Sequence, residues 1–253
     1  MSVQESGQGG AVPDADAPPA RAARHLTVVH AVQEMIRGGE LGPGDRLPIE
    51  STLAERLDIS RNTLREGVRA LVAMGILETR QGSGTTVTPL TPELLLGPLT
   101  FWVDIQEDRT TGDLHTVRRA LEVESAALAA RRRTPADITA LRAILRKAEP
   151  AIRSRDHEAA MKADLEFHAM LARSGGNTIL SALLDSLSQP TLRVRMWQSL
   201  HRSERLDATH QEHLSILDAV AAGDVQFASS AMHTHLTQVT MALDANEANN
   251  DHP

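Results

Sequence analysis

The chain has 253 residues, a formal net charge of 26 − 33 = −7, and 41% apolar but only 2% aromatic residues. This length allows one large domain or two ordinary ones, and the scarcity of aromatic residues favours helices over a β-sandwich or barrel. The absence of cysteine excludes disulfide bonds, a thiol nucleophile and a cysteine-held zinc ion. The mean hydropathy is −0.24 and no secretory signal begins the chain, so we expect a cytoplasmic protein without a membrane span.

Charge is distributed unevenly along the sequence. Residues 1–20 hold three acids and no base, residues 21–90 hold nine Arg and eight acids, and residues 91–253 hold seventeen bases and twenty-two acids. The segment 21–90 is therefore the least acidic part, and all of its bases are Arg. The guanidinium group suits forked contacts with phosphate and guanine, which points to nucleic acid as a partner of this segment.

Composition also marks the domain boundaries. Both ends of the chain are poor in large apolar side chains and are predicted to be disordered. Three prolines fall within residues 88–98, where turns and short strands give way to long Ala/Leu/Arg/Glu segments. The predicted division is a tail (1–20), a first domain (21–90), a linker or first helix (91–112), a helical domain (113–243) and a second tail (244–253).

Apolar spacing in the first domain predicts helices over 26–37, 49–57 and 60–74, followed by strands over 76–80 and 84–88. The side chains expected to face inward are Val28, Val32, Met35, Ile36, Leu53, Ala54, Leu57, Leu64, Val68, Leu71 and Val72. Three helices with a tight second turn and a hairpin are typical of a winged helix-turn-helix. The alternative is another small α+β domain.

The third predicted helix carries an unusual first turn. Ser60 is a good N-cap, and the residues around it are Arg61, Asn62, Thr63 and Arg65. Hydroxyl, guanidinium and amide groups at this end of a helix favour DNA bases and phosphates, whereas a merely solvated face more often carries Lys and Glu.

The sequence of the second domain predicts helices throughout. They are predicted over 113–132, 135–153, 156–173, 177–200, 203–222 and 224–243, with breaks at Pro135, Gly175-Gly176 and Gly223-Asp224. Six helices, or seven if 92–106 is helical, can form an antiparallel all-α bundle. The stretch 92–106 has few charges, so we expect it to pack on the bundle or to join a dimer contact.

Four polar residues of this domain could share an interior site. Asp164 and His168 are four residues apart on one helix face, while His213 and His235 lie at similar distances on either side of Gly223. One carboxylate and three imidazoles suit a first-row divalent metal.

Spacing alone does not show which histidines would bind the metal. The chain has eleven, and His210 and His233 lie close to His213 and His235. We expect four of the eleven to be merely solvated: His201, His210, His233 and His252.

Residues 39–87, which read GELGPGDRLP…LAERLDISRNTLREGVRALVAMGILETRQGSGTTV, resemble the GntR family of bacterial transcription regulators. The resemblance implies that Arg61, Asn62, Thr63 and Arg65 contact DNA from a recognition helix, and that Gly82 is the wing-tip glycine near the minor groove. One departure is the motif LPIES, in which Ser51 stands where the family usually has a DNA-contacting Arg. That contact is not carried over to this chain.

Residues 113–240 resemble the ligand-binding (FCD-type) domain of the FadR subfamily of GntR regulators. The matching pieces are VRRALEVESAALAA, DLEFHAML…SGGN, EHLSILDAVAAGD and AMHTHL. The resemblance implies a divalent metal, often zinc or nickel, held by Asp164, His168, His213 and His235. It also places Arg118 near the metal cavity.

A metal beside Arg118 suits a carboxylate effector, with one oxygen on each. The alternative for Arg118 is an i,i+4 ion pair with Glu122. Asn177 could bind the same effector through a hydroxyl group, or it could cap the helix that follows it.

Together these features predict a homodimeric regulator that binds operator DNA and senses a small carboxylate, with release of DNA on effector binding, as in a repressor. A first alternative makes the metal itself the signal. A second is a metal-dependent hydrolase, but we find no HExxH motif and no residue placed as a general base, so we do not expect an enzyme.

Overall fold

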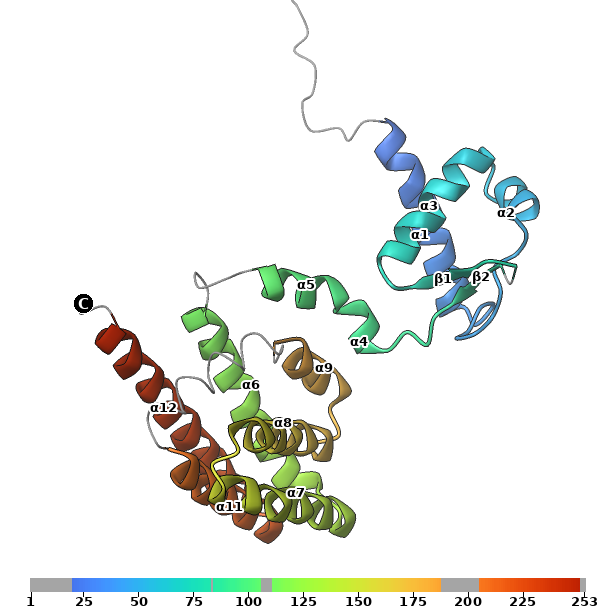
Figure 1. Cartoon of the computed structure of the whole chain (residues 1–253). Helices are drawn as coiled ribbons and strands as arrows, with labels where there is room; N and C mark the ends of the chain where they lie inside the picture. The colour runs from blue at the N-terminus through green and yellow to red at the C-terminus, as the bar shows by residue number, and fades with distance from the viewer. Residues whose placement is uncertain (1–19, 83, 106–110, 188–204, 251–253) are drawn as a thin grey trace, which may run out of the picture. The chain divides into compact units, whose positions relative to one another are not determined.

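The computed structural model in Figure 1 describes residues 20–82, 84–105, 111–187 and 205–250. The chain divides into two units, Met1–Thr91 and Pro92–Pro253, and their junction falls inside the proline-containing stretch 88–98. Residues 1–19, expected to form a disordered tail, lie outside the described part. Each unit is considered by itself below.

The first unit contains three helices and a two-stranded hairpin. They are α1 (Ala20–Arg37), α2 (Glu50–Arg56), α3 (Arg61–Ala73), β1 (Leu77–Arg80) and β2 (Gly84–Val87). The strands are antiparallel, with Leu77 opposite Val87 and Arg80 opposite Gly84. This is the predicted winged helix-turn-helix, with element ends within a few residues of the expected ones except at the start of α1.

Close packing of α3 against α1 fixes the core of this unit. Gly67 is buried on α3, and a Cβ atom there would lie 2.4 Å from Cβ of Val28. Leu64, Gly67 and Leu71 therefore form the buried stripe of α3. Val72 was expected to face inward, but it lies beside this stripe and is 37% exposed.

The second unit is helical throughout its described residues, as predicted. Its helices are α4 (Pro92–Leu95), α5 (Gly97–Ile105), α6 (Thr111–Arg132), α7 (Pro135–Arg153), α8 (His157–Ser174), α9 (Thr178–Leu187), α11 (Leu206–Ala222) and α12 (Val225–Asn250). The single helix considered for 92–106 is two, because Pro98 cannot donate a backbone hydrogen bond and favours the start of a new helix at Gly97.

Five long helices make the bundle. Helix α6 packs against α8 and α12, α7 packs against α8 and α11, and α11 packs against α12. Phe167 and Leu171 of α8 meet Leu141, Ile216 and Met232 in the core, and all five are almost fully buried. Among the described residues, no helix has the length and apolar character needed to cross a membrane.

Local signals position the helices that matter for the site. Asp156 caps α8 by accepting a hydrogen bond from the amide of Ala159 at 3.0 Å. Gly223 ends α11 with φ +77°, a left-handed conformation that favours glycine, and α12 begins two residues later. This short turn lets α11 and α12 pack on each other.

Three expectations for this unit need correction or fall outside the described residues. Helix α12 continues to Asn250, although we expected disorder from residue 244, because residues 244–252 contain no Gly or Pro to end it. Apolar spacing predicts that Val117, Leu121, Leu128 and Ala129 line one side of α6, but Val117 is 49% exposed. The predicted helix 177–200 is described only as far as Leu187.

Candidate DNA-binding surface and metal centre

The first turn of α3 presents polar groups to solvent. Ser60 caps the helix, because its side chain accepts a hydrogen bond from the amide of Thr63 at 3.1 Å. Arg61, Asn62 and Arg65 are exposed, whereas Thr63 is half-buried with its hydroxyl 2.9 Å from that of Ser60. The three exposed side chains are therefore available to an outside partner, while Ser60 and Thr63 also build the helix end.

Arg65 has an acidic neighbour that the sequence interpretation missed. Its Nε and Nη2 lie 2.9 and 2.8 Å from Oε2 of Glu50, the first residue of α2. Glu50 directly precedes Ser51, which replaces the family's usual Arg. An exposed carboxylate thus orients one of the predicted DNA-contacting side chains.

The hairpin turn contains Gly82, the predicted wing-tip residue. It is exposed and has φ +79°, a conformation that side chains other than glycine rarely adopt. A Cβ atom there would meet nothing within 4 Å, so the backbone of the turn is open to a partner.

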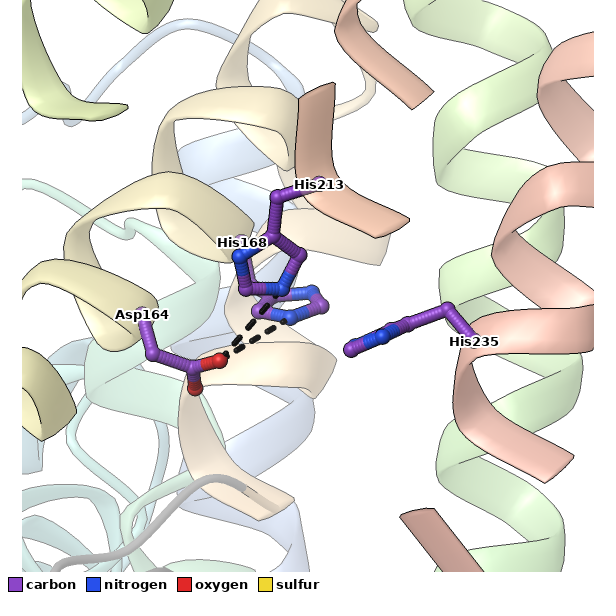
Figure 2. Close-up of side chains that lie close together, drawn as sticks. All are labelled: Asp164, His168, His213 and His235. Atoms are coloured by element: carbon purple, nitrogen blue, oxygen red, sulfur yellow. Dashed lines mark ion pairs between the residues drawn. The ribbon is translucent and has the colours of Figure 1, made fainter. Parts of the chain in front are cut away.

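The predicted metal ligands lie together in the second unit. Asp164 and His168 come from α8, His213 from α11 and His235 from α12, and one potential ligand atom from each lies within 4.8 Å of the others. Figure 2 shows the four side chains converging from the three helices. The histidines are buried and Asp164 is 13% exposed.

Contacts within the cluster aim its atoms at a common centre. Oδ1 of Asp164 lies 3.7 Å from Nε2 of His168 and 3.4 Å from Nε2 of His213. Phe167 stacks on the ring of His213, with centroids 4.6 Å apart. This packing restrains the ring of His213, so the apolar core holds this potential metal ligand in place.

The protonation state of His213 favours metal binding. Burial, followed by the nearby His235 and His168, lowers the pKa of His213 well below its ordinary value. The imidazole is therefore neutral at physiological pH. Its Nε2 is buried and makes no hydrogen bond within the described part of the chain. Three imidazole nitrogens and one carboxylate oxygen fit a divalent cation such as zinc or nickel.

Two carboxylates contact the Nδ1 atoms of His168 and His235. Glu122 contacts Nδ1 of His168, and Oε2 of Glu212 lies 2.8 Å from Nδ1 of His235. Each contact leaves Nε2 of that histidine for the cluster. Carboxylates in this position hold metal-binding histidines in one tautomer and orientation. The sequence interpretation missed both roles, because nothing in the chain order connects Glu212 with His235.

An arginine in turn pairs with each of these carboxylates. Nε of Arg118 donates a hydrogen bond to Oε1 of Glu122, and Arg205 pairs with Oε1 of Glu212. The chain thus repeats one arrangement twice, Arg118–Glu122–His168 and Arg205–Glu212–His235. The charge of each glutamate, the buried Glu122 and the partly exposed Glu212, is balanced by a guanidinium group.

Arg118 forms an i,i+4 ion pair with Glu122, which was the alternative considered for this residue. Its side chain is only 3% exposed. It also lines a small pocket together with His115 and residues of α12. Through Glu122 it is connected to His168.

Asn177 does not join the cluster. Its side chain is exposed and accepts a hydrogen bond from the amide of Leu180 at 3.1 Å, so it caps α9. The structure shows the capping alternative for this residue.

One of the histidines set aside as solvated is buried. His210 is 9% exposed and lines a pocket with Asp164 and His213. His233 is exposed, as expected, while His201 and His252 lie outside the described residues.

Comparisons with known proteins match both units. The profile of the bacterial regulatory proteins, gntR family, matches residues 24–87, and that of the FCD domain matches residues 113–238. The HTH-type transcriptional regulator LutR of Bacillus subtilis (strain 168) is 35% identical over 83% of this chain and 96% of its own. A regulatory protein of Escherichia coli (strain K12) that is named for the L-lactate dehydrogenase operon is 31% identical over 84% of this chain and 83% of its own.

Two further relatives agree with these. The HTH-type transcriptional repressor NanR of Escherichia coli (strain K12 / DH10B) is 30% identical over 90% of this chain and 87% of its own. The solved structure of a GntR protein of Streptococcus agalactiae is 32% identical, with a TM-score of 0.62 over 85% of this chain and 98% of that chain. These relatives are regulators, which argues against the hydrolase alternative. The chain therefore belongs to the GntR family of DNA-binding transcriptional regulators, with the FCD domain of its FadR-type members, and is not an enzyme.

Proposed function

We propose that this regulator is a repressor whose FCD domain binds a divalent metal, zinc or nickel, and senses a small organic acid there. The observation that carries the proposal is the convergence of Asp164, His168, His213 and His235 within 4.8 Å in a buried interior. When bound, the metal supplies a Lewis-acidic partner for a carboxylate. The relative named for the L-lactate dehydrogenase operon supports an organic acid as effector, since lactate is one.

Arg118 supplies the second positive group of this interior. It is buried, carries a guanidinium group suited to carboxylates, and is linked to His168 through Glu122. We propose that it contributes to the binding of the acid. Arg118→Gln should weaken binding of the acid more than binding of the metal, and equal losses of both would remove Arg118 from the effector site.

The DNA-binding half of the proposal assigns operator contacts to the exposed side chains of α3 and to the wing. Arg61 and Asn62 would contact bases or phosphates, and Gly82 would let the wing backbone approach DNA. Arg61→Ala should weaken operator binding by about 1–3 kcal/mol if the guanidinium is bidentate to a base. Unchanged binding in a fluorescence anisotropy titration would remove Arg61 from the interface.

A repressor requires that the acid favour one state of the protein over the other. The name of the relative NanR, a transcriptional repressor, supports release of DNA on effector binding. The proposal also includes a cytoplasmic location, because operator DNA lies there.

We further propose a homodimer on a palindromic operator. Helix α5 exposes Phe101, Trp102 and Ile105, while Val103 of the same helix is buried against Leu114 and Leu187. Large exposed apolar side chains on one helix are typical of a protein contact. Sedimentation equilibrium should give a dimer, and Phe101→Glu should shift it toward the monomer.

A thermal-shift panel tests the effector proposal directly. Small carboxylates added to the metal-loaded protein should raise the melting temperature, because a ligand that binds only the folded state stabilises it by mass action. The same panel on protein treated with a chelator is the control. No shift with any carboxylate would overturn the proposal of an acid effector.

A further inference from the structure

Arg205 directly precedes α11 and contacts side chains of both α11 and α12, the helices that carry His213 and His235. Its Nη2 donates a hydrogen bond to Oε1 of Glu212 on α11. Its Nη1 donates at 3.3 Å to Oε1 of Gln238 on α12. Gln238 lies three residues after His235, so the two are neighbours on the surface of that helix. Arg205 therefore joins the start of α11 to the turn of α12 that carries a predicted ligand.

Both oxygens of the Glu212 carboxylate are engaged. Oε1 accepts the hydrogen bond from Arg205, while Oε2 lies 2.8 Å from Nδ1 of His235. A carboxylate held at both oxygens keeps one orientation, and in that orientation it favours the tautomer of His235 whose Nε2 is available to a metal. Loss of the contact with Arg205 would leave the carboxylate held at one oxygen only.

The two carboxylates that contact the histidines differ in what keeps them in place. The side chain of Glu122 is 3% exposed, so the surrounding core restricts it, whereas that of Glu212 is 22% exposed. A partly exposed carboxylate can exchange a protein partner for water at little cost in free energy. Burial alone therefore does not fix Glu212. Within the described residues, the cation paired with it is Arg205, whose side chain is 20% exposed.

We propose that Arg205 is a positioning residue of the metal site. It holds Glu212 against Nδ1 of His235 and thereby increases the affinity of the FCD domain for its divalent metal, while Gln238 holds the guanidinium group in place. This inference rests on the proposed function, since it concerns the metal that the cluster would bind. Neither Arg205 nor Gln238 belongs to the ligand set that the family resemblance implies.

Competition for zinc between the full chain and a chromophoric chelator tests the proposal. Arg205→Gln should lower the zinc affinity about 3- to 10-fold, which is less than the loss expected for a residue that contacts a ligand, because Arg205 lies one contact further from the metal. Arg155→Gln is the matched control. It removes an exposed ion pair with Asp207, in the first turn of the same helix, and should leave the zinc affinity unchanged.

The outcomes of this titration separate the inference from the proposed function. Equal zinc affinities of Arg205→Gln and the unmodified protein would overturn the inference and leave the proposed function standing. Failure of the unmodified protein to bind zinc or nickel would overturn the proposed function itself.

A double substitution tests the route through Glu212. If Arg205 acts by holding this carboxylate, Arg205→Gln should cost no further zinc affinity in a protein that already carries Glu212→Gln, because the two residues act as one unit. A further loss as large as that of the single Arg205→Gln variant would show that Arg205 acts independently of Glu212, contrary to the proposal.

Cobalt(II) in place of zinc gives a readout that a general loss of stability would not change. Its visible absorption depends on the ligands and their geometry, so Arg205→Gln should alter the spectrum and Arg155→Gln should not. Arg205→Lys keeps the positive charge beside Glu212 and should lose less zinc affinity than Arg205→Gln. An unaltered cobalt spectrum for Arg205→Gln, or equal losses of zinc affinity in the two Arg205 variants, would contradict the assigned role.

Discussion

The first turn of α3 and the cluster of Asp164, His168, His213 and His235 present their polar groups in opposite ways. Arg61, Asn62 and Arg65 come from one turn of α3 and are exposed. The cluster draws on α8, α11 and α12, and its histidines are buried. The first surface can be altered without disturbing the fold, whereas the second is part of the core. Substitutions in the two regions should therefore differ in what they change.

The largest expected effect is at the cluster. His213→Ala removes one of four ligand atoms and should abolish stoichiometric metal uptake, measured by elemental analysis of the purified protein. Circular dichroism should show that the variant remains helical. His233→Ala, on an exposed position of α12, is the control and should keep the metal. Full metal content in the His213 variant would rule out this ligand set.

A packing substitution shows that the exposed surface also depends on a buried contact. Gly67→Ala would place a Cβ atom 2.4 Å from Cβ of Val28, so α3 and α1 must separate. Overpacking of this kind costs about 1–3 kcal/mol, measured as a lower free energy of unfolding in denaturant. Metal content should not change. A variant as stable as the parent protein would show that α1 and α3 are less closely packed than described.

Substitution of a supporting carboxylate should have a smaller effect than loss of a ligand. Glu212→Gln keeps the size of the side chain but weakens the contact with Nδ1 of His235, and metal affinity should fall about 10- to 100-fold. Competition with a chromophoric chelator measures this change. Glu124→Gln, at an exposed position of α6, should leave the affinity unchanged. An unaltered affinity for Glu212→Gln would mean that the glutamate only fills space.

The smallest effect is expected at Glu50. Glu50→Gln weakens the pairing with Arg65, and because both side chains are more than half exposed the stability should hardly change. Binding to nonspecific DNA should tighten slightly, since a carboxylate near the phosphates is removed. Arg65→Ala in the same titration should act in the opposite direction. Weaker binding by Glu50→Gln would instead show that Glu50 must orient Arg65.

Sequence reasoning succeeded where a pattern was local. Helix α3 and its N-cap follow from Ser60 and the apolar spacing of α3, and the proximity of Asp164 and His168 follows from their separation of four residues. His213 and His235 could be brought together because the single turn at Gly223 sets their depth, and resemblance to the family then selected them.

Features that depend on contacts between distant segments were not predictable. Nothing in the sequence indicates that Glu212 contacts Nδ1 of His235 or that Glu50 pairs with Arg65. His210 was taken as solvated because its face of α11 could not be known before the packing of α7 and α8. Val72 and Val117 were assigned to buried faces for the same reason, and the continuation of α12 to Asn250 shows that composition alone misjudged the tail.

In the proposed mechanism, an acid acts through the cluster of Asp164, His168, His213 and His235 to change DNA binding. The direct measurement is the affinity for a DNA fragment selected by the protein from random sequence, with metal and the small carboxylates of the thermal-shift panel added separately and together. We expect at least one of these carboxylates to weaken DNA binding of the metal-loaded protein and to have no effect after chelation. A response to metal alone with none to any acid, or an equal response to acid in the chelated protein, would contradict it.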